Sequence, residues 1–240
     1  MKFFSGFALA FSMLTILPFF KVHNFFKGIN GYSALSYPLI GLIIGLLLWL
    51  FSSLLSPFVP SFHLGAIIFA LWIFLTGALH LDGLSDTIDG LFVPKEKAFE
   101  VMKDSHIGGM GAIFTFTFLL LKFSLLCTTD FYAYLPLVLL LSRLNATLAI
   151  YLFKYSGGGM GALTKKELQL WQVLCALAIA IIFSFLFHTY LLIFISLCTL
   201  LLAGIFFAKR LGGLSGDIYG FIIEVSELIM LESLLLFYSS

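Results

Sequence analysis

No Asp, Glu, Lys or Arg occurs in residues 28–81, which read "GINGYSALSYPLIGLIIGLLLWLFSSLLSPFVPSFHLGAIIFALWIFLTGALHL". A membrane-spanning helix needs about 20 apolar residues, so this uncharged stretch is long enough for two spans. Its middle, "SPFVPSFH" (residues 56–63), contains two prolines, which interrupt helices and favour turns. The stretch therefore predicts a helical hairpin in a membrane.

The rest of the chain continues this pattern. It is 61% hydrophobic and 10% charged, whereas a soluble domain is about 25% charged. We predict an all-α fold, a polytopic integral membrane helix bundle with about seven to eight transmembrane segments, in one domain covering residues 1–240. The eight hydrophobic segments are residues 4–20, 34–56, 63–80, 110–128, 132–153, 168–187, 189–207 and 219–237. The first segment has a proline near its end, and an interfacial position remains an alternative for it.

The basic residues predict the orientation. Ten of the 13 Lys and Arg residues lie in the connections after the first, third, fifth and seventh segments, which share one side of the membrane. Basic connections mark the cytoplasmic side. The conspicuous polar motifs lie on the same side, so we predict a protein of the cell (inner) membrane with a site that faces the cytoplasm.

An acidic motif follows the uncharged stretch, "HLDGLSDTIDG" (residues 80–90). If the third helix continues through it, Asp82, Asp86 and Asp89 lie within about 60° of one another on one face. Such carboxylates repel, and Mg²⁺ is usually held by a few carboxylates together with substrate phosphates. We therefore predict a Mg²⁺ site, with a solvated helix end as the alternative. His80 is a ligand, a general base or a partner of a ligand, and the sequence does not separate these roles.

A second acidic set opens the last segment, "GDIYGFIIEVSE" (residues 216–227). Asp217 and Glu224 are seven residues apart and share a helix face, whereas Glu227 is rotated away by about 60°. The predicted metal ligands are Asp82, Asp86, Asp89, Asp217 and Glu224.

Glycine-rich turns and basic residues predict phosphate contacts. Asp104 or Ser105 is expected to cap the helix that follows "KDSHIGGMG" (residues 103–111). The backbone N–H groups at such a helix start favour anions. Arg143, which we interpret as the only basic residue well inside a helix, should have a carboxylate or phosphate partner in the bundle interior. The predicted substrate- or phosphate-binding residues are Lys103, Asp104, His106, Arg143, Lys209, Gly213 and Gly216.

Together these features favour a metal-dependent enzyme that acts on a diphosphate by positioning it and neutralising its charge. Two alternatives remain. A secondary transporter would use the carboxylates as an ion relay, near the bilayer midplane and within repeats. Another Mg²⁺-dependent membrane transferase, of the CDP-alcohol or prenyl type, would also place aspartates around a diphosphate.

Five motifs resemble the cobalamin synthase family, membrane-bound adenosylcobinamide-GDP ribazoletransferases. They are "HLDGLSDTIDG", "YPLIGLIIG" (37–45), "VMKDSHIGGMGA" (101–112), "SR" (142–143) and "LGGLSGDIYGFIIEVSELIML" (211–231). The resemblance implies a Mg²⁺-dependent enzyme that joins adenosylcobinamide-GDP to α-ribazole or its 5′-phosphate, late in cobalamin biosynthesis. The products would be GMP and adenosylcobalamin or its 5′-phosphate.

The resemblance also implies catalytic residues and partners. His80, Asp82, Asp86 and Asp89 would be catalytic. The expected partners are the two substrates and the lipid bilayer, with no nucleic acid. A homo-oligomer or a corrinoid-assembly complex stays open.

Overall fold

The computed structural model describes residues 2–18, 22, 25–157 and 159–238. Within these residues the regular secondary structure is helical, apart from an isolated bridge between Tyr155 and Leu214. The helices are α1 (Lys2–Leu14), α2 (Ile29–Leu55), α3 (Ser61–Thr76), α4 (Leu79–Leu91), α5 (Lys95–Val101), α6 (Gly109–Thr128), the 3₁₀ helix η1 (Phe131–Tyr134), α7 (Leu135–Leu152), α8 (Gly159–Glu167), α9 (Leu170–Leu186), α10 (Tyr190–Leu211) and α11 (Gly216–Tyr238). The predicted all-α class is confirmed.

Several helices can cross a membrane, so the polytopic class is also confirmed. Among the described residues, 4 helices are long and apolar enough, namely α2, α6, α7 extended by η1, and α10. The number rises to 6 if each of two bent pairs, α3 with α4 and α8 with α9, is one span. The sequence predicted about seven to eight. The difference arises at the chain ends, because α1 has only 13 residues and α11 carries four acidic side chains.

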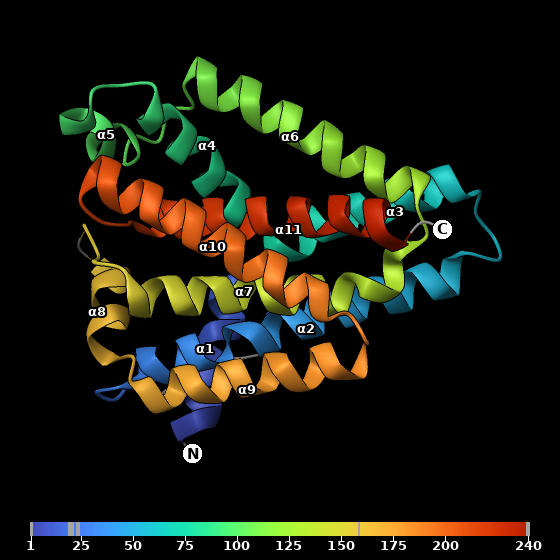
Figure 1. Cartoon of the computed structure of the whole chain (residues 1–240), viewed down its shortest axis with the longest axis horizontal. Helices are drawn as coiled ribbons and strands as arrows, with labels where there is room; N and C mark the ends of the chain where they lie inside the picture. Colours follow the sequence, from blue (N-terminus) through green and yellow to red (C-terminus); the bar gives the residue numbers. More distant parts are fainter. Residues whose placement is uncertain (1, 19–21, 23–24, 158, 239–240) are drawn as a thin grey trace.

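Helix α7 is the centre of the bundle. Its residues from Leu135 to Ile150 are all buried, and α2, α9, α10 and α11 pack around it. Figure 1 shows these helices running roughly along the long axis, with α6 inclined along one side of the bundle next to α4 and α11. Large apolar side chains such as Phe194 and Leu202 are exposed on the outside. An apolar exterior is what contact with lipid requires.

The third hydrophobic segment is broken, which corrects the expectation that residues 80–90 continue its helix. Helix α3 ends at Thr76 and α4 begins at Leu79, with a bend of 83° between them. Gly77 and Ala78 both have left-handed backbone conformations, with φ values of 60° and 56°. Glycine adopts this conformation readily, and a side chain disfavours it. The acidic motif therefore has a helix of its own, α4, which leaves α3 near the middle of the molecule (Figure 1).

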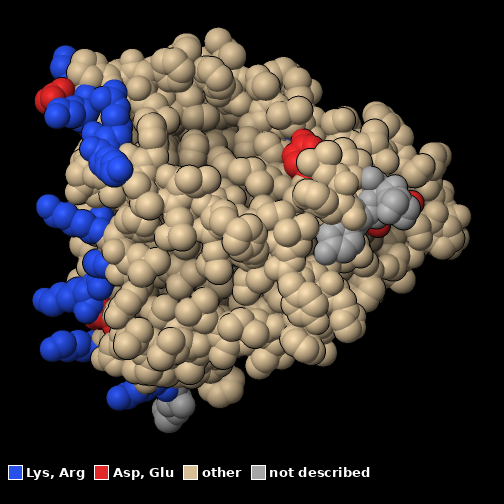
Figure 2. Space-filling model, viewed as in Figure 1, with Lys and Arg blue, Asp and Glu red and all other residues tan. Residues whose placement is uncertain are grey.

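The exposed basic side chains that the structure describes gather mainly at one end of the molecule. In Figure 2 the visible Lys and Arg residues lie at the end where Figure 1 shows α5, α8 and the C-terminal end of α10. The one-sided distribution agrees with the sequence pattern. The N-terminal ends of α6 and α11 also lie at this end (Figure 1), so the loops with the polar motifs are close together in space.

Candidate functional site

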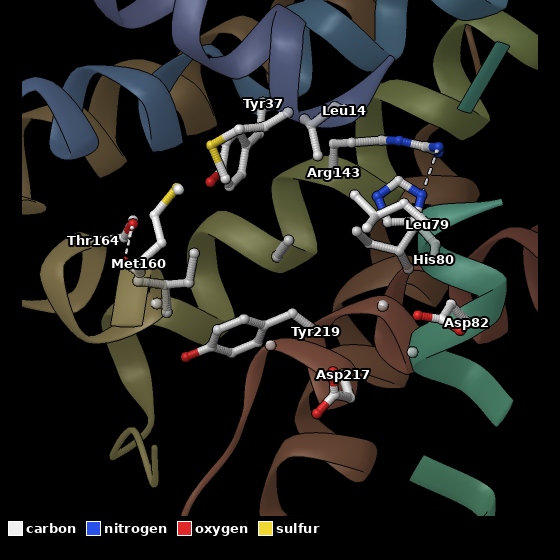
Figure 3. A pocket seen from close by; sticks show the side chains of 18 residues that line it. Leu14, Tyr37, Leu79, His80, Asp82, Arg143, Met160, Thr164, Asp217 and Tyr219 are labelled. Carbon is white, nitrogen blue, oxygen red and sulfur yellow. Dashed lines mark hydrogen bonds between the residues drawn. The ribbon is translucent and has the colours of Figure 1, made fainter. Parts of the chain in front are cut away.

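A cavity of about 280 Å³ lies between α1, α2, α4, α7, α8 and α11. Five of the residues predicted from the sequence line it, namely His80, Asp82, Arg143, Gly216 and Asp217. They come from three separate helices, and Figure 3 shows four of them around one space. The fold thus brings together the two acidic motifs, which are far apart in the sequence.

Close packing of α4 on α11 places Asp82 beside Asp217. A Cβ atom on Gly83 would come within 2.8 Å of the Asp217 carbonyl oxygen, so only glycine allows the two helices to approach this closely. Asp217 lies in the first turn of α11, where its carboxylate accepts a hydrogen bond from the Ser215 hydroxyl at 3.2 Å. Asp82 is exposed to the cavity.

The charge around these carboxylates is largely negative. Asp82, Asp89 and Asp217 all lie close enough to Asp86 to repel its charge, and Lys103 is close enough to Asp217 to attract it. In the part of the chain that the structure describes, no three His, Cys, Asp or Glu side chains already converge as a metal site would require. Mg²⁺ needs only one or two carboxylates besides substrate phosphates, so Asp82, Asp86 and Asp217 fit a substrate-bound ion.

Asp89 has a different environment. Its two carboxylate oxygens accept hydrogen bonds from the backbone N–H groups of Gly108, at 2.8 Å, and Gly111, at 2.7 Å. The expectation that Asp104 or Ser105 caps this helix is wrong, because the N-cap of α6 is Gly108 and the acceptor comes from α4. The start of α6 therefore binds an anion, but the anion is the protein's own carboxylate.

The loop between α5 and α6 is exposed. His106 Nδ1 lies 2.7 Å from a carboxylate oxygen of Asp104, and this hydrogen bond raises the pKa of His106 and lowers the pKa of Asp104. Both residues line a shallow hollow with Asp89, of about 530 Å³, rather than the cavity between α4 and α11. Phosphate binding by Lys103, Asp104 and His106 stays a prediction.

The glycine-rich turn before α11 also has one predicted residue at the cavity and one away from it. Gly216 lines the cavity, whereas Gly213 is buried against the loop that holds Ser156. The turn is fixed by hydrogen bonds from Leu214 N–H to the Lys154 carbonyl and from Ser156 N–H to the Leu214 carbonyl. Lys209 is exposed at the end of α10 and is not part of the cavity lining.

A charge-balanced network lies in the core beside the cavity. Lys122 of α6 donates to Glu224, at 2.9 Å, and to Glu227, and Arg143 of α7 donates to Glu227 and to the Ser142 hydroxyl. All four charged side chains are buried. The predicted carboxylate partner of Arg143 is therefore confirmed as Glu227. Glu224, predicted as a metal ligand with Asp217, instead pairs with Lys122.

The network reaches the cavity through His80. The Nη2 atom of Arg143 lies 3.4 Å from Nδ1 of the buried imidazole (Figure 3). A guanidinium can only donate, so Nδ1 is the acceptor and the neutral ring carries its proton on Nε2. Among the described residues, Nε2 has no hydrogen-bond partner. This geometry favours His80 as a hydrogen-bond donor to a bound ligand over a role as general base.

Three residues of the site were missed or undervalued in the sequence. Lys122 is as deeply buried as Arg143, which corrects the view that Arg143 is the only basic residue well inside a helix. Glu227 was placed off the face of Asp217 and was not linked to a cation, and Tyr219, which lines the cavity, was not considered. A cation within an apolar segment needs an intramembrane anion, and that signal links Lys122 to Glu227.

Comparison with known proteins identifies the family of this chain. The family described as cobalamin-5-phosphate synthase matches residues 6–235. The chain belongs to this family. The expectation of a transferase in cobalamin biosynthesis is therefore confirmed.

The similarity to individual members extends over most of the chain. An adenosylcobinamide-GDP ribazoletransferase of Desulfitobacterium hafniense is 37% identical over 81% of this chain and 82% of the relative. The enzyme of the same name from Stutzerimonas stutzeri is 37% identical, covering 86% and 88%, and that from Acinetobacter baumannii is 32% identical, covering 97% of both chains. No solved structure matches the chain significantly.

Proposed function

We propose that this chain joins adenosylcobinamide-GDP to α-ribazole, or to its 5′-phosphate, and releases GMP. The product would be adenosylcobalamin or its 5′-phosphate. Family membership and the names of the relatives support the substrates. The observation that carries the chemistry is the placement of Asp82 and Asp217 on one cavity wall, with Asp86 one turn further along α4.

Mg²⁺ is the proposed cofactor. Asp82, Asp86 and Asp217 would hold it, because Asp82 and Asp217 line the cavity and Asp86 is close enough to both to be repelled by their charges. Asp89 and Glu224 are already bonded within the protein. When bound, the ion neutralises charge on the diphosphate of the substrate.

The carboxylates also position the acceptor. In the proposed step, a ribazole hydroxyl oxygen forms a bond to the phosphorus that carries the cobinamide arm. The bond from this phosphorus to the bridging oxygen breaks, GMP leaves with that oxygen, and the hydroxyl proton passes to Asp82 or Asp217 on the cavity wall. Lys103, which lies close to Asp217, would stabilise the charge on the departing phosphate.

Reconstitution tests this proposal. Purified protein in detergent is incubated with adenosylcobinamide-GDP and α-ribazole, with Mg²⁺ or with a chelator, and GMP and the corrinoid product are measured. We expect both products in equal amounts with Mg²⁺ and none with chelator. GMP without a corrinoid product would indicate a hydrolase, and full turnover in chelator would contradict the metal role.

We also propose that the basic end of the bundle faces the cytoplasm of the inner membrane. The exposed residues Ser105 and Asp130 lie near opposite ends of α6, which separates them along the direction of the bundle. In intact cells, an impermeant thiol reagent should label Asp130→Cys and leave Ser105→Cys unlabelled until the cells are opened. The reverse pattern would contradict this orientation.

A further inference from the structure

The cavity between α4 and α11 has two unlike sides. Figure 3 shows His80, Asp82 and Asp217 on one side and the side chains of Tyr37 and Met160 on the other. Apolar side chains, among them those of Leu14, Ile150 and Ile223, complete the wall. A ligand that fills this space needs one polar end and one apolar end.

Two buried polar groups at the cavity lack partners. The Tyr219 hydroxyl and His80 Nε2 make no hydrogen bond within the described part of the chain, although these side chains are only 7% and 3% exposed. Buried polar atoms nearly always have a partner in a folded protein. Both residues line the cavity, so a bound ligand can supply the missing acceptors.

We propose that this cavity is the subsite for the nucleoside acceptor of the reaction. This assignment rests on the proposed function. The fused aromatic base of the nucleoside would lie against Tyr37, Met160 and Tyr219, and its ribose would point toward Asp82 and Asp217. Tyr155 stacks on Tyr219 at a centroid distance of 6.1 Å and holds that ring in place.

The hydrogen-bonding chemistry matches on both sides. The base of α-ribazole is apolar except for one unsubstituted ring nitrogen, which can only accept a hydrogen bond. The Tyr219 hydroxyl can donate to this nitrogen, and His80 Nε2–H can donate to a ribose oxygen. The ribose hydroxyls are donors, and they would face the two carboxylates. The hydroxyl that reacts would thus lie beside the proposed metal site.

The other substrate does not fit this space. A cavity of about 280 Å³ suits a nucleoside, whereas a corrinoid ring with its nucleotide arm is several times larger. The guanosine diphosphate group is strongly charged, and the apolar side of the cavity offers it no cation. The donor substrate would therefore bind outside the cavity and present its diphosphate to Asp82 and Asp217.

Protection from thiol labelling tests the subsite independently of turnover. Met160 lines the cavity, whereas Leu163, on the same helix α8, does not. Met160→Cys and Leu163→Cys are labelled in detergent with a maleimide, and the labelling of the three native cysteines is subtracted. We expect saturating α-ribazole to slow labelling at position 160 at least about five-fold and to leave position 163 unchanged.

The outcomes separate the subsite from the overall reaction. Equal protection of both positions, or no protection at 160 while the variant still turns over, would overturn the subsite. Protection at 160 by adenosylcobinamide-GDP instead of α-ribazole would also overturn it. If α-ribazole protects position 160 but no product forms with both substrates, the proposed reaction fails and the subsite stands.

The Tyr219 hydroxyl supplies a second test. Tyr219→Phe keeps the ring and removes one hydrogen bond, which corresponds to roughly a five-fold loss of affinity. We expect the KM for α-ribazole to rise by about that factor, with kcat and the KM for adenosylcobinamide-GDP nearly unchanged. Tyr190→Phe, a matched change on the exposed surface of α10, should leave all three constants unchanged. A Tyr219→Phe variant that loses only kcat would contradict the assignment.

Discussion

The acidic residues of this protein lie in two opposite electrostatic environments. Asp82 on α4 and Asp217 at the start of α11 line one cavity, Asp86 is close enough to both to be repelled, and Lys103 is a nearby cation. Two turns further along α11, Glu224 and Glu227 are buried and bonded to Lys122 and Arg143.

This difference separates carboxylates that can bind a ligand from carboxylates that stabilise the fold. Buried charges that balance one another hold α6, α7 and α11 together, and their removal would expose a partner to an apolar medium. Carboxylates that repel one another destabilise the protein unless a ligand compensates them, so a cluster of this kind indicates a binding site. Acidic residues of both kinds look alike in the sequence. Only their partners distinguish them.

The largest effect is expected where charge is uncompensated. Asp82→Asn keeps the size of the side chain and removes a charge beside the proposed metal site, so turnover should fall by roughly 10³-fold. Asp130→Asn, an exposed residue at the other end of α6, is the control. GMP release in membranes at saturating Mg²⁺ measures both variants. Turnover of Asp82→Asn close to that of the control would show that the cavity carboxylates are not the reactive centre.

The buried network should respond in stability first. Glu227→Gln leaves Lys122 and Arg143 with one carboxylate between them, which should reduce the free energy of unfolding by about 3 kcal/mol. At 2–4 °C per kcal/mol, Tm in detergent should fall by roughly 6–12 °C. The control is Glu232→Gln, a partly buried residue further along α11. Equal Tm values for the two variants would mean that the network does not hold the helices together.

Much of the fold follows from the sequence because lipid imposes simple rules. Long apolar stretches predicted helices α2, α6, α7, α9 and α10, and the basic connections predicted which ends share a side. The break after Thr76 was not predicted. A Gly-Ala pair carries no strong turn signal, and the left-handed conformation of Ala78 is uncommon for a residue with a side chain.

The sequence gives more information about the residue types of the candidate site than about the contacts between them. Helical spacing grouped Asp82 with Asp86, which lie close together in the structure, and the motif that opens α11 supplied Asp217, which lines the same cavity as Asp82. Spacing alone also added Asp89 and Glu224, since it contains no information about neighbouring helices. Their partners, Gly108 and Lys122, lie on α6 or at its start. Such contacts between helices decide whether a carboxylate is free to bind a ligand.

Asp89 allows a finer test of the same distinction. Asp89→Asn has one carboxamide oxygen where two carboxylate oxygens accept the N–H groups of Gly108 and Gly111, so it should reduce the free energy of unfolding by about 1–2 kcal/mol. The Mg²⁺ concentration for half-maximal rate should not change. Asp86→Asn should raise that concentration and leave stability nearly unchanged. If both variants raise the Mg²⁺ requirement equally, Asp89 belongs to the metal site.

The smallest effect is expected in the exposed loop between α5 and α6, where Asp104 and His106 are paired and also contact solvent. The Asp104 carboxylate raises the pKa of His106. Protonation therefore strengthens this contact fully below the ordinary histidine pKa, about 6.5. The added strength is lost as the pH rises through the raised pKa. Asp104→Asn should lower the pKa of His106 toward its ordinary value. NMR titration of ¹³C-labelled histidine in micelles measures this shift, with His106→Gln to assign the signal.

Turnover should hardly follow that titration, because both side chains are exposed and lie outside the cavity. Exposed ion pairs contribute little, so we expect rates of Asp104→Asn and His106→Gln within about two-fold of the wild type at pH 6 and pH 8. A ten-fold loss in His106→Gln alone, with unchanged Tm, would place His106 in contact with substrate phosphate. The loop would then belong with the uncompensated region, and the boundary of the site would extend from α4 to the start of α6.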